Sequence, residues 1–410
     1  MNRKNSKVTG NSVFLKPNYS DSVMKNLLEQ LPPKFDSILK MKDYQVQILY
    51  TQIDRGKNGI AKLTDHSYNL DSQVYFYPAS TVKLPVAILA LQKLNELNIP
   101  GLNKNTTMIT EADYEGQSPV YNDTSSLDGR PTIEHYIKKI LLVSDNDAFN
   151  RLYEFLGQEY INNNLHKLGY KDVEIIHRLD ISMTEDQNRH TNSVKFFDSN
   201  NELIYEKPAT NSQYVYAERN TKMGKGYYKD GQLINEPFDF SKKNRMSLSS
   251  LHAILISIIT PERVHAESRF NLTKDDYNFL HKYMSMMPRE SAYPSYDSVN
   301  YRDTYVKFLF YGSEKISAIP EIRIFNKVGD AYGFLIDASY FVDFKNKVEF
   351  FLSTVIHCNR DEIFNDNKYD YDSIGFPFMK NLGRVIYEYE LKRKKEVLPD
   401  LSSFIFDYSQ

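Results

Sequence analysis

The chain has 410 residues, 41% of them hydrophobic, and a formal net charge of -2. This length and hydrophobic content suit a large buried core and two or three structural units. The nearly balanced charge excludes a general electrostatic attraction to nucleic acid or anionic lipid. A single cysteine, Cys358, excludes an internal disulfide and a cysteine-based zinc site, and the nine histidines lack metal-ligand spacing, so we expect no metal.

The N-terminal part of the chain is polar before its first apolar pattern. We expect residues 1–20 to form a flexible arm. Their basic start is not followed by an apolar run, so we expect no signal peptide and no transmembrane segment in this sequence. Apolar spacing over residues 21–40 predicts a helix interrupted at a Pro-Pro pair. Residues 44–50 and a run from Ile60 then predict a hairpin.

The stretch around Ser80 is the centre of the sequence. An almost unbroken apolar run follows Ser80 and Lys83 and predicts a buried helix over about residues 79–95. Residues three apart share one helix face, so the Lys83 amine can reach the Ser80 hydroxyl. A helix start favours negative charge on the serine oxygen, and burial favours a neutral lysine, which together give a nucleophile beside a base. The S-x-x-K pattern also occurs by chance, as at Ser37 and Lys40, so the rest of the chain must decide.

Helices are expected through most of the middle of the chain. Thr132 is the predicted N-cap of a helix that runs into a polar break at residues 144–146, and two glycine-terminated helices follow. Residues 190–243 alternate between polar and apolar side chains and predict an inserted, hairpin-like segment. Helical spacing returns over parts of residues 246–286.

The C-terminal quarter changes to strand patterns. Three runs within residues 322–357 are joined by short turns and predict an antiparallel meander, and residues 376–395 predict a closing helix. The strands most simply form one sheet, with the middle helices as a separate lobe, which makes this an α+β protein. We therefore predict an α/β lobe from residues 21–78 and 318–410, and a helical lobe from residues 79–317 that carries Ser80 and the 190–243 insertion.

Three short motifs fall in order along this map: Ser80-Thr81-Val82-Lys83, Ser144-Asp145-Asn146 and Lys327-Val328-Gly329. The set S-x-x-K, S-D-N and K-T-G is the signature of class A β-lactamases and penicillin-binding proteins. Over most of its length the chain resembles a class A β-lactamase-type serine hydrolase. The resemblance implies a three-layer α/β/α sandwich with an antiparallel five-stranded sheet, an all-helical lobe and no cofactor.

The resemblance also implies catalytic roles. Ser80 would attack a carbonyl carbon, and Lys83 would take its proton directly or through a relay. Ser144 and Lys327 would pass a proton to the leaving nitrogen and hold a substrate carboxylate. Asn146 would hydrogen-bond a substrate amide.

Further binding positions follow from the third motif. The oxyanion hole would be formed by the backbone N–H groups of Ser80 and of Ala331 or its neighbour. Val328 and Gly329 would contact substrate. Val328 stands where the family has a threonine or serine, so a hydroxyl that would help to bind a carboxylate is missing, and we expect poor turnover of penicillins.

A second departure concerns the base for deacylation. The family has a glutamate in the pattern Arg-aromatic-Glu-x-x-x-Asn, whereas this chain has Asp180 two residues after Arg178, with Thr184 in place of the asparagine. Asp180 is one methylene shorter than glutamate, so we expect slow deacylation. A loop aspartate that caps a turn is the alternative interpretation, and Glu185 is the other nearby carboxylate.

The leading functional interpretation is a serine hydrolase that opens a β-lactam or a related amide or ester through an acyl-enzyme on Ser80. One alternative is a D-Ala-D-Ala-type peptidase or transpeptidase. Another is a non-catalytic descendant that binds cell-wall peptide, with residues 190–243 as a partner surface. We expect a small-molecule or cell-wall-peptide substrate, no nucleic-acid partner, a monomer and, by resemblance, a periplasmic or secreted location.

Overall fold

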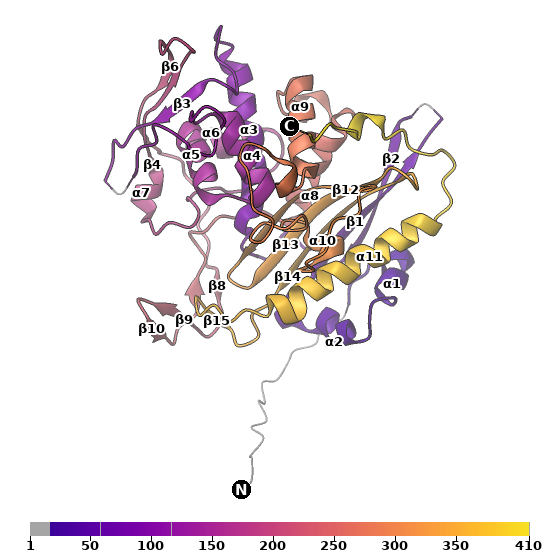
Figure 1. Ribbon diagram of the computed structural model, residues 1–410. Coiled ribbons are helices and arrows are strands. Elements are labelled where there is room, and N and C mark those ends of the chain that lie inside the picture. Colours follow the sequence, from indigo (N-terminus) through magenta and orange to yellow (C-terminus); the bar gives the residue numbers. More distant parts are fainter. Residues whose placement is uncertain (1–16, 58, 116, 410) are drawn as a thin grey trace.

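The computed structural model describes residues 17–57, 59–115 and 117–409, so most of the expected flexible arm lies outside the described residues. A five-stranded sheet forms the centre of one lobe, and buried helices gather at one end of it (Figure 1). Among the described residues, no helix is long and apolar enough to cross a membrane.

The central sheet has the strand order β12-β13-β14-β1-β2, and every pair in it is antiparallel. The C-terminal meander and the N-terminal hairpin therefore join into one sheet through the β14–β1 pair, in which Gln47 lies opposite Val355. The predicted meander and five-stranded sheet are confirmed. The strands are β1 (Gln47–Arg55), β2 (Ala61–Tyr68), β12 (Ile322–Ala331), β13 (Phe334–Asp343) and β14 (Val348–His357).

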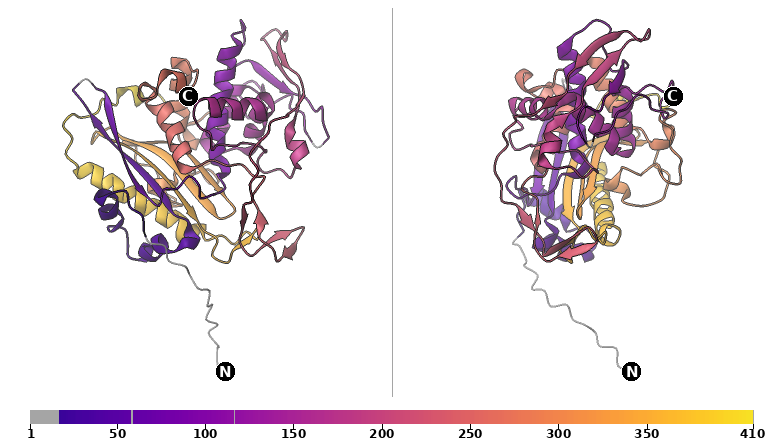
Figure 2. Two further views of the ribbon diagram at one scale, coloured as in Figure 1. Left: turned by 180° about the vertical axis from the view of Figure 1, so that it is seen from behind. Right: turned by 90° about the vertical axis from the view of Figure 1, so that its left-hand side faces the viewer.

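Helices cover both faces of this sheet. As a result, β13 and β14 are buried along their whole lengths. One face packs with α1 (Ser22–Leu28), α2 (Lys34–Lys40), α10 (Phe308–Tyr311) and the long α11 (Phe376–Lys392) around a shared apolar cluster. The other face is covered by α8 (Leu248–Ile259) and α9 (Lys274–Ser285). This is the predicted three-layer α/β/α arrangement, and Figure 2 shows the layers from two further sides.

The position of α8 differs from the predicted lobe division, which placed residues up to 317 with the helical lobe. The helix is apolar around most of its circumference, so it needs cover on more than one side. Its His252 bonds to Thr51 and Ser353 on the sheet, at 2.8 and 2.7 Å. The helix thus forms a layer of the sheet and shares a core with the neighbouring lobe.

The helix that follows Ser80 is the buried axis of the second lobe. A 3-10 turn, η2 (Ala79–Val82), continues into α3 (Lys83–Leu97), and eleven residues of α3 are buried. Ser80 therefore lies in the 3-10 turn, and Pro85 falls in the first α-helical turn, where its missing N–H has no helical partner to lose. The surrounding helices are α4 (Ile133–Val143), α5 (Asn146–Leu156) and α6 (Gln158–Lys167).

This lobe is not all-helical, which corrects the prediction. Residues 107–110 and 194–207, which are rich in β-branched or aromatic side chains, pair as a small three-stranded sheet, β3-β5-β6. The insertion forms further short strands, as predicted from its alternation. The short elements are β3 (Thr107–Thr110), α7 (Glu185–Arg189), β4 (His190–Thr191), β5 (Val194–Phe197), β6 (Leu203–Lys207), β7 (Thr210–Asn211), β8 (Lys222–Met223), β9 (Gly226–Lys229), β10 (Gln232–Ile234) and β11 (Phe238–Asp239).

The insertion also reaches the segment that follows the central sheet. Strand β15 (Ile363–Phe364) pairs in parallel with β9, with Ile363 opposite Gly226. Gly224 makes this approach possible, since a Cβ there would lie 2.5 Å from the Glu362 carbonyl oxygen. The insertion and residues 359–371 are thereby tied together beside the end of β12.

Candidate active site

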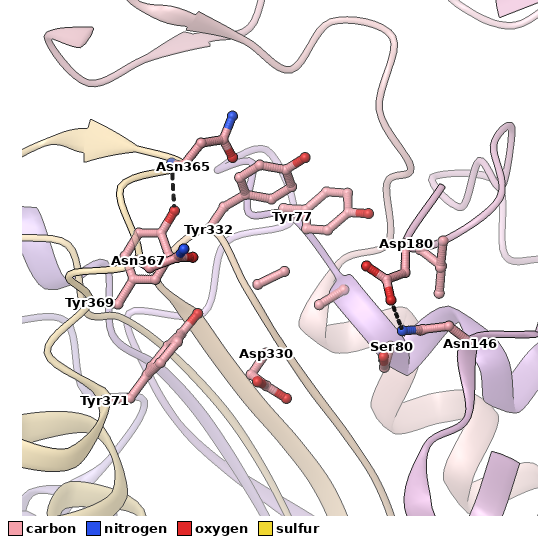
Figure 3. A pocket seen from close by; sticks show the side chains of 13 residues that line it. Tyr77, Ser80, Asn146, Asp180, Asp330, Tyr332, Asn365, Asn367, Tyr369 and Tyr371 are labelled. Carbon is pink, nitrogen blue, oxygen red and sulfur yellow. Dashed lines mark hydrogen bonds between the residues drawn. The ribbon is translucent and has the colours of Figure 1, made fainter. Parts of the chain in front are cut away.

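The cleft that contains Ser80 lies between the central sheet and the helical lobe, and its volume is about 430 Å³. Figure 3 shows its side chains converging from η2, α5, the loop before α7, the end of β12 and the segment after β14. The lining residues are Tyr77, Ala79, Ser80, Asn146, Leu179, Asp180, Asp330, Ala331, Tyr332, Asn365, Asn367, Tyr369 and Tyr371.

The backbone around Ser80 is held against the edge strand β12. The Thr81 amide donates to the Pro78 carbonyl oxygen at 3.1 Å, and the Thr81 hydroxyl donates to the same oxygen at 2.6 Å. A Cβ at Gly329 would lie only 2.9 Å from both the Ser80 nitrogen and the Pro78 oxygen. Gly329, expected to bind substrate, is thus required for the strand to approach the turn of Ser80.

Lys83 is fully buried and its amine is surrounded by acceptors. Its Nζ lies 2.9 Å from Ser80 Oγ and 2.6 Å from Asn146 Oδ1, and it also donates to the Ser144 carbonyl oxygen. Burial lowers the pKa of Lys83 to about 7, with nearby aspartates opposing that shift. A neutral Lys83 has two N–H groups for these two carbonyl oxygens, which leaves its lone pair for the Ser80 hydroxyl proton.

Ser144 connects the two buried lysines. Its Oγ accepts from Lys327 Nζ at 2.8 Å and lies 3.3 Å from Lys83 Nζ. Its left-handed backbone, with φ 63°, ends α4, and Asp145 then caps α5 by accepting from the Ala148 amide at 2.7 Å. The polar break in the sequence is therefore both a helix boundary and a cluster of candidate catalytic groups.

Asp180 lies at the mouth of the same cleft. It accepts from Asn146 Nδ2 at 3.2 Å, and its φ of 56° turns the loop there. The side-chain amide of Asn150 holds the adjacent backbone, because it exchanges two hydrogen bonds with Leu179, at 3.0 and 2.9 Å. Asp180 therefore lines the same cleft as Ser80 and contacts Asn146.

The loop that carries Asp180 is fastened by a buried ion pair. The Arg178 guanidinium donates to Glu154 on α5 at 2.9 and 2.6 Å and also bonds the His190 carbonyl oxygen at 2.7 Å. Glu154 in turn accepts from the Asn192 amide at 2.6 Å. The sequence identified Arg178 but not Glu154, whose only signal is a charged residue at an apolar-face position of α5.

Glu185, the competing carboxylate, lies outside the cleft. It bonds Tyr216, Lys242 and Arg189, and those bonds lower its pKa to about 2. Thr184 does not take the place of the family's asparagine in this cleft; its hydroxyl caps α7 instead.

Val328 does not line the cleft, although it was expected to contact substrate. Its side chain is buried in the apolar cluster beneath α11 and is not among the residues that line the cleft. Successive residues of a strand face opposite sides, so the side chains of Lys327 and Val328 cannot share one environment. A hydroxyl at position 328 would therefore point into the core.

The alternation of β12 indicates which backbone N–H group of this strand faces the turn that carries Ser80. Tyr332 and Gly333 have φ values of 53° and 81° and form a two-residue turn, so Ala331 and Phe334 are a directly hydrogen-bonded pair. The next N–H outward, that of Asp330, points away from β13 toward η2. Of the expected donors, Ala331 or its neighbour, this geometry favours the neighbour, Asp330.

A polar and aromatic wall completes the cleft opposite the helical lobe. The Tyr371 hydroxyl accepts from the Gly333 amide at 2.9 Å and donates to the Phe334 carbonyl oxygen at 3.2 Å. Tyr369 bonds the Asn365 amide at 2.9 Å. No motif marks this wall in the sequence, although residues 365–371 are rich in asparagine and tyrosine.

Comparison with protein families gives a match over residues 31–211 to the family described as "Beta-lactamase enzyme family". That range contains Ser80, Lys83, Ser144 and Asp180. Residues 31–211, a little under half of the chain, are therefore similar to that family. The matched range includes strands β1 and β2 of the central sheet and helices α3 to α6.

Solved structures with a similar fold are also named β-lactamases. One from Chitinophaga pinensis is 12% identical, with 89% of this chain and 99% of that chain covered and a TM-score of 0.48. One from Burkholderia phymatum is 10% identical, with 89% and 96% covered and a TM-score of 0.47. A halotolerant bacterial β-lactamase is 13% identical, with 91% and 100% covered and a TM-score of 0.46. Comparison with curated protein sequences gives no match.

Proposed function

We propose that this β-lactamase family protein cleaves an amide or ester through an acyl-enzyme on Ser80. The observation that carries the proposal is the position of Lys83 Nζ, 2.9 Å from Ser80 Oγ in a fully buried site. Lys83 takes the Ser80 proton while Oγ forms a bond to the substrate carbonyl carbon. The N–H groups of Ser80 and Asp330 stabilise the negative charge on the carbonyl oxygen.

The leaving group then departs with a proton from the Ser144 hydroxyl. Ser144 recovers a proton from the lysines beside it, Lys327 at 2.8 Å and Lys83 at 3.3 Å. Asp180 accepts a proton from the water that attacks the ester carbon. The bond from that carbon to Ser80 Oγ then breaks, the acid is released and a proton returns to Ser80 Oγ. The short aspartate reach makes this second step the slow one.

Intact-protein mass spectrometry over time tests the proposal. A neutral fluorophosphonate should add one adduct to the wild type, mapped to Ser80, and none to Ser80→Ala. A substrate ester or β-lactam should give an adduct that decays. An adduct that persists would favour the peptidase hypothesis, and absence of any adduct on Ser80 would favour the non-catalytic one. The periplasmic or secreted location remains a prediction.

A further inference from the structure

The cleft contains two carboxylates and no exposed cation. Of the residues that line it, only Asp180 and Asp330 are charged, and none is a lysine or arginine. Figure 3 shows both carboxylates near Ser80. The lysines beneath are not available to a ligand in the cleft: Lys83 is 0% exposed and Lys327 is 2% exposed.

Lys327 is occupied as well as buried. Its amine donates to Ser144 Oγ and to the Val328 carbonyl oxygen, both at 2.8 Å. Burial, together with the neighbouring Lys83, lowers the pKa of Lys327 well below its usual value. A substrate carboxylate in this cleft would meet two acidic side chains and no solvent-facing positive charge.

Asp330 is the more available of the two carboxylates. Its side chain reaches the cleft and, within the part of the chain that the structure describes, forms no hydrogen bond or ion pair, whereas Asp180 is bonded by Asn146. Desolvation raises the pKa of Asp330, and the nearby Lys327 and Lys83 oppose that shift. It lies in the cleft with Tyr332, Tyr369 and Tyr371. Aromatic rings beside a carboxylate favour a cation, because the ring faces and the negative charge attract it together.

We propose that this cleft selects acyl substrates that carry an ammonium group, held by Asp330 and the adjacent tyrosines, and discriminates against substrates that carry a carboxylate at that position. The inference rests on the proposed acylation of Ser80 and names its substrate class. The charge of the two carboxylates can select between ammonium and carboxylate substrates because the cleft is partly enclosed. Solvent therefore screens these carboxylates less than it would on an open surface.

Three fluorophosphonates that differ only in the end of their tail test this inference. One tail ends in an ammonium group, one is neutral and one ends in a carboxylate. The second-order rate constant for Ser80 labelling, measured by intact mass at low salt, should be at least roughly tenfold higher for the ammonium probe than for the carboxylate probe. Raising the salt concentration should reduce that ratio.

The variants assign the preference to one side chain. Asp330→Asn should remove most of the preference, so that the rate constants for labelling by the ammonium and carboxylate probes become similar. Only the smaller effect of Asp180 should remain. Glu388→Gln is the matched control, because Glu388 is an exposed carboxylate on α11 that does not line the cleft, and its ratio should equal that of the wild type. The salt dependence of the wild type tests the electrostatic origin of the preference without a substitution.

The outcomes separate the two proposals. If the neutral probe fails to label Ser80, the acylation proposal fails and this inference fails with it. If Ser80 is labelled but the carboxylate probe reacts as fast as the ammonium probe, only the charge selection is wrong. An unchanged ratio in Asp330→Asn would likewise overturn the assignment to Asp330.

Discussion

At the scale of single residues, the proposed acylation depends on one lysine whose pKa burial lowers to about 7. Lys83 follows the nucleophile by one turn, and the apolar residues of α3 that surround it exclude water. The same helix carries Lys93, whose pKa burial also lowers to about 7, but Lys93 bonds the Phe155 carbonyl oxygen away from the cleft. Position relative to Ser80, and not the shifted pKa, distinguishes the two.

Acylation should therefore depend on pH through Lys83. The neutral amine accepts the Ser80 proton, and its pKa is about 7, so labelling by a neutral fluorophosphonate should rise with pH and level off above that value. Well below it the rate should fall about tenfold per pH unit. Lys83→Met should lower the rate by about 10²-fold or more.

Lys93→Met is the control for this pH profile. It removes a half-buried lysine from α3 without touching the cleft, so the midpoint near pH 7 should remain. A midpoint that moves with Lys93, or a profile that stays flat in the wild type, would contradict the assignment of the base to Lys83.

Val328 gives a second prediction at this scale. Its side chain packs beneath α11, so Val328→Thr should not raise labelling by the carboxylate-tailed probe relative to the neutral one. It should lower the free energy of unfolding by about 1–3 kcal/mol, because a hydroxyl is buried without a partner. Chemical denaturation and the labelling ratio measure the two effects. A selective gain with the carboxylate probe would show that position 328 faces the substrate after all.

At the scale of elements, the loop before α7 holds Asp180 in place through Arg178 and Glu154. Both side chains are nearly inaccessible, at 2% and 4% exposure, and each also bonds backbone groups of residues 190–192. Arg178 is a positioning residue, because it does not line the cleft. Its loss should move Asp180, the proposed base of the second chemical step, more than it moves Ser80.

Glu154→Gln or Arg178→Ala should lower the free energy of unfolding by about 3–5 kcal/mol, since each leaves a buried charge without its partner. Deacylation should slow more than acylation, which time-resolved intact mass separates. Arg360→Ala is the control: Arg360 is 59% exposed in its pair with Asp370, so its loss should cost less than about 1 kcal/mol. Equal slowing of both chemical steps would indicate a general loss of structure.

At the scale of the whole molecule, the cleft is completed by two segments far apart in the sequence. The insertion contributes β9 and the segment after the sheet contributes β15, and their pairing places the tyrosine and asparagine wall opposite Asp180. This arrangement gives the insertion a structural role at the cleft.

Two glycines of the insertion test that role as a matched pair. Gly224 and Gly231 have φ of 73° and 77°, so alanine strains both backbones alike, but only at Gly224 would the new Cβ meet other atoms, at 2.5 Å from Glu362. Gly224→Ala should therefore speed amide hydrogen exchange over residues 359–371, and Gly231→Ala should not. Equal exchange in the two variants would contradict the predicted coupling of insertion and wall.

The sequence by itself determined the parts of this protein that local geometry controls. The three-residue spacing of Ser80 and Lys83, the caps at residues 144–146 and the alternation within the C-terminal strands each specify a structure through neighbours in the chain. Only the tertiary structure decided that Glu185 lies outside the cleft, that Val328 faces the core and that Asp330 lies in the cleft among tyrosines. Those features depend on contacts between segments far apart in the sequence, such as the pairing of β9 with β15. A local sequence pattern does not specify such contacts.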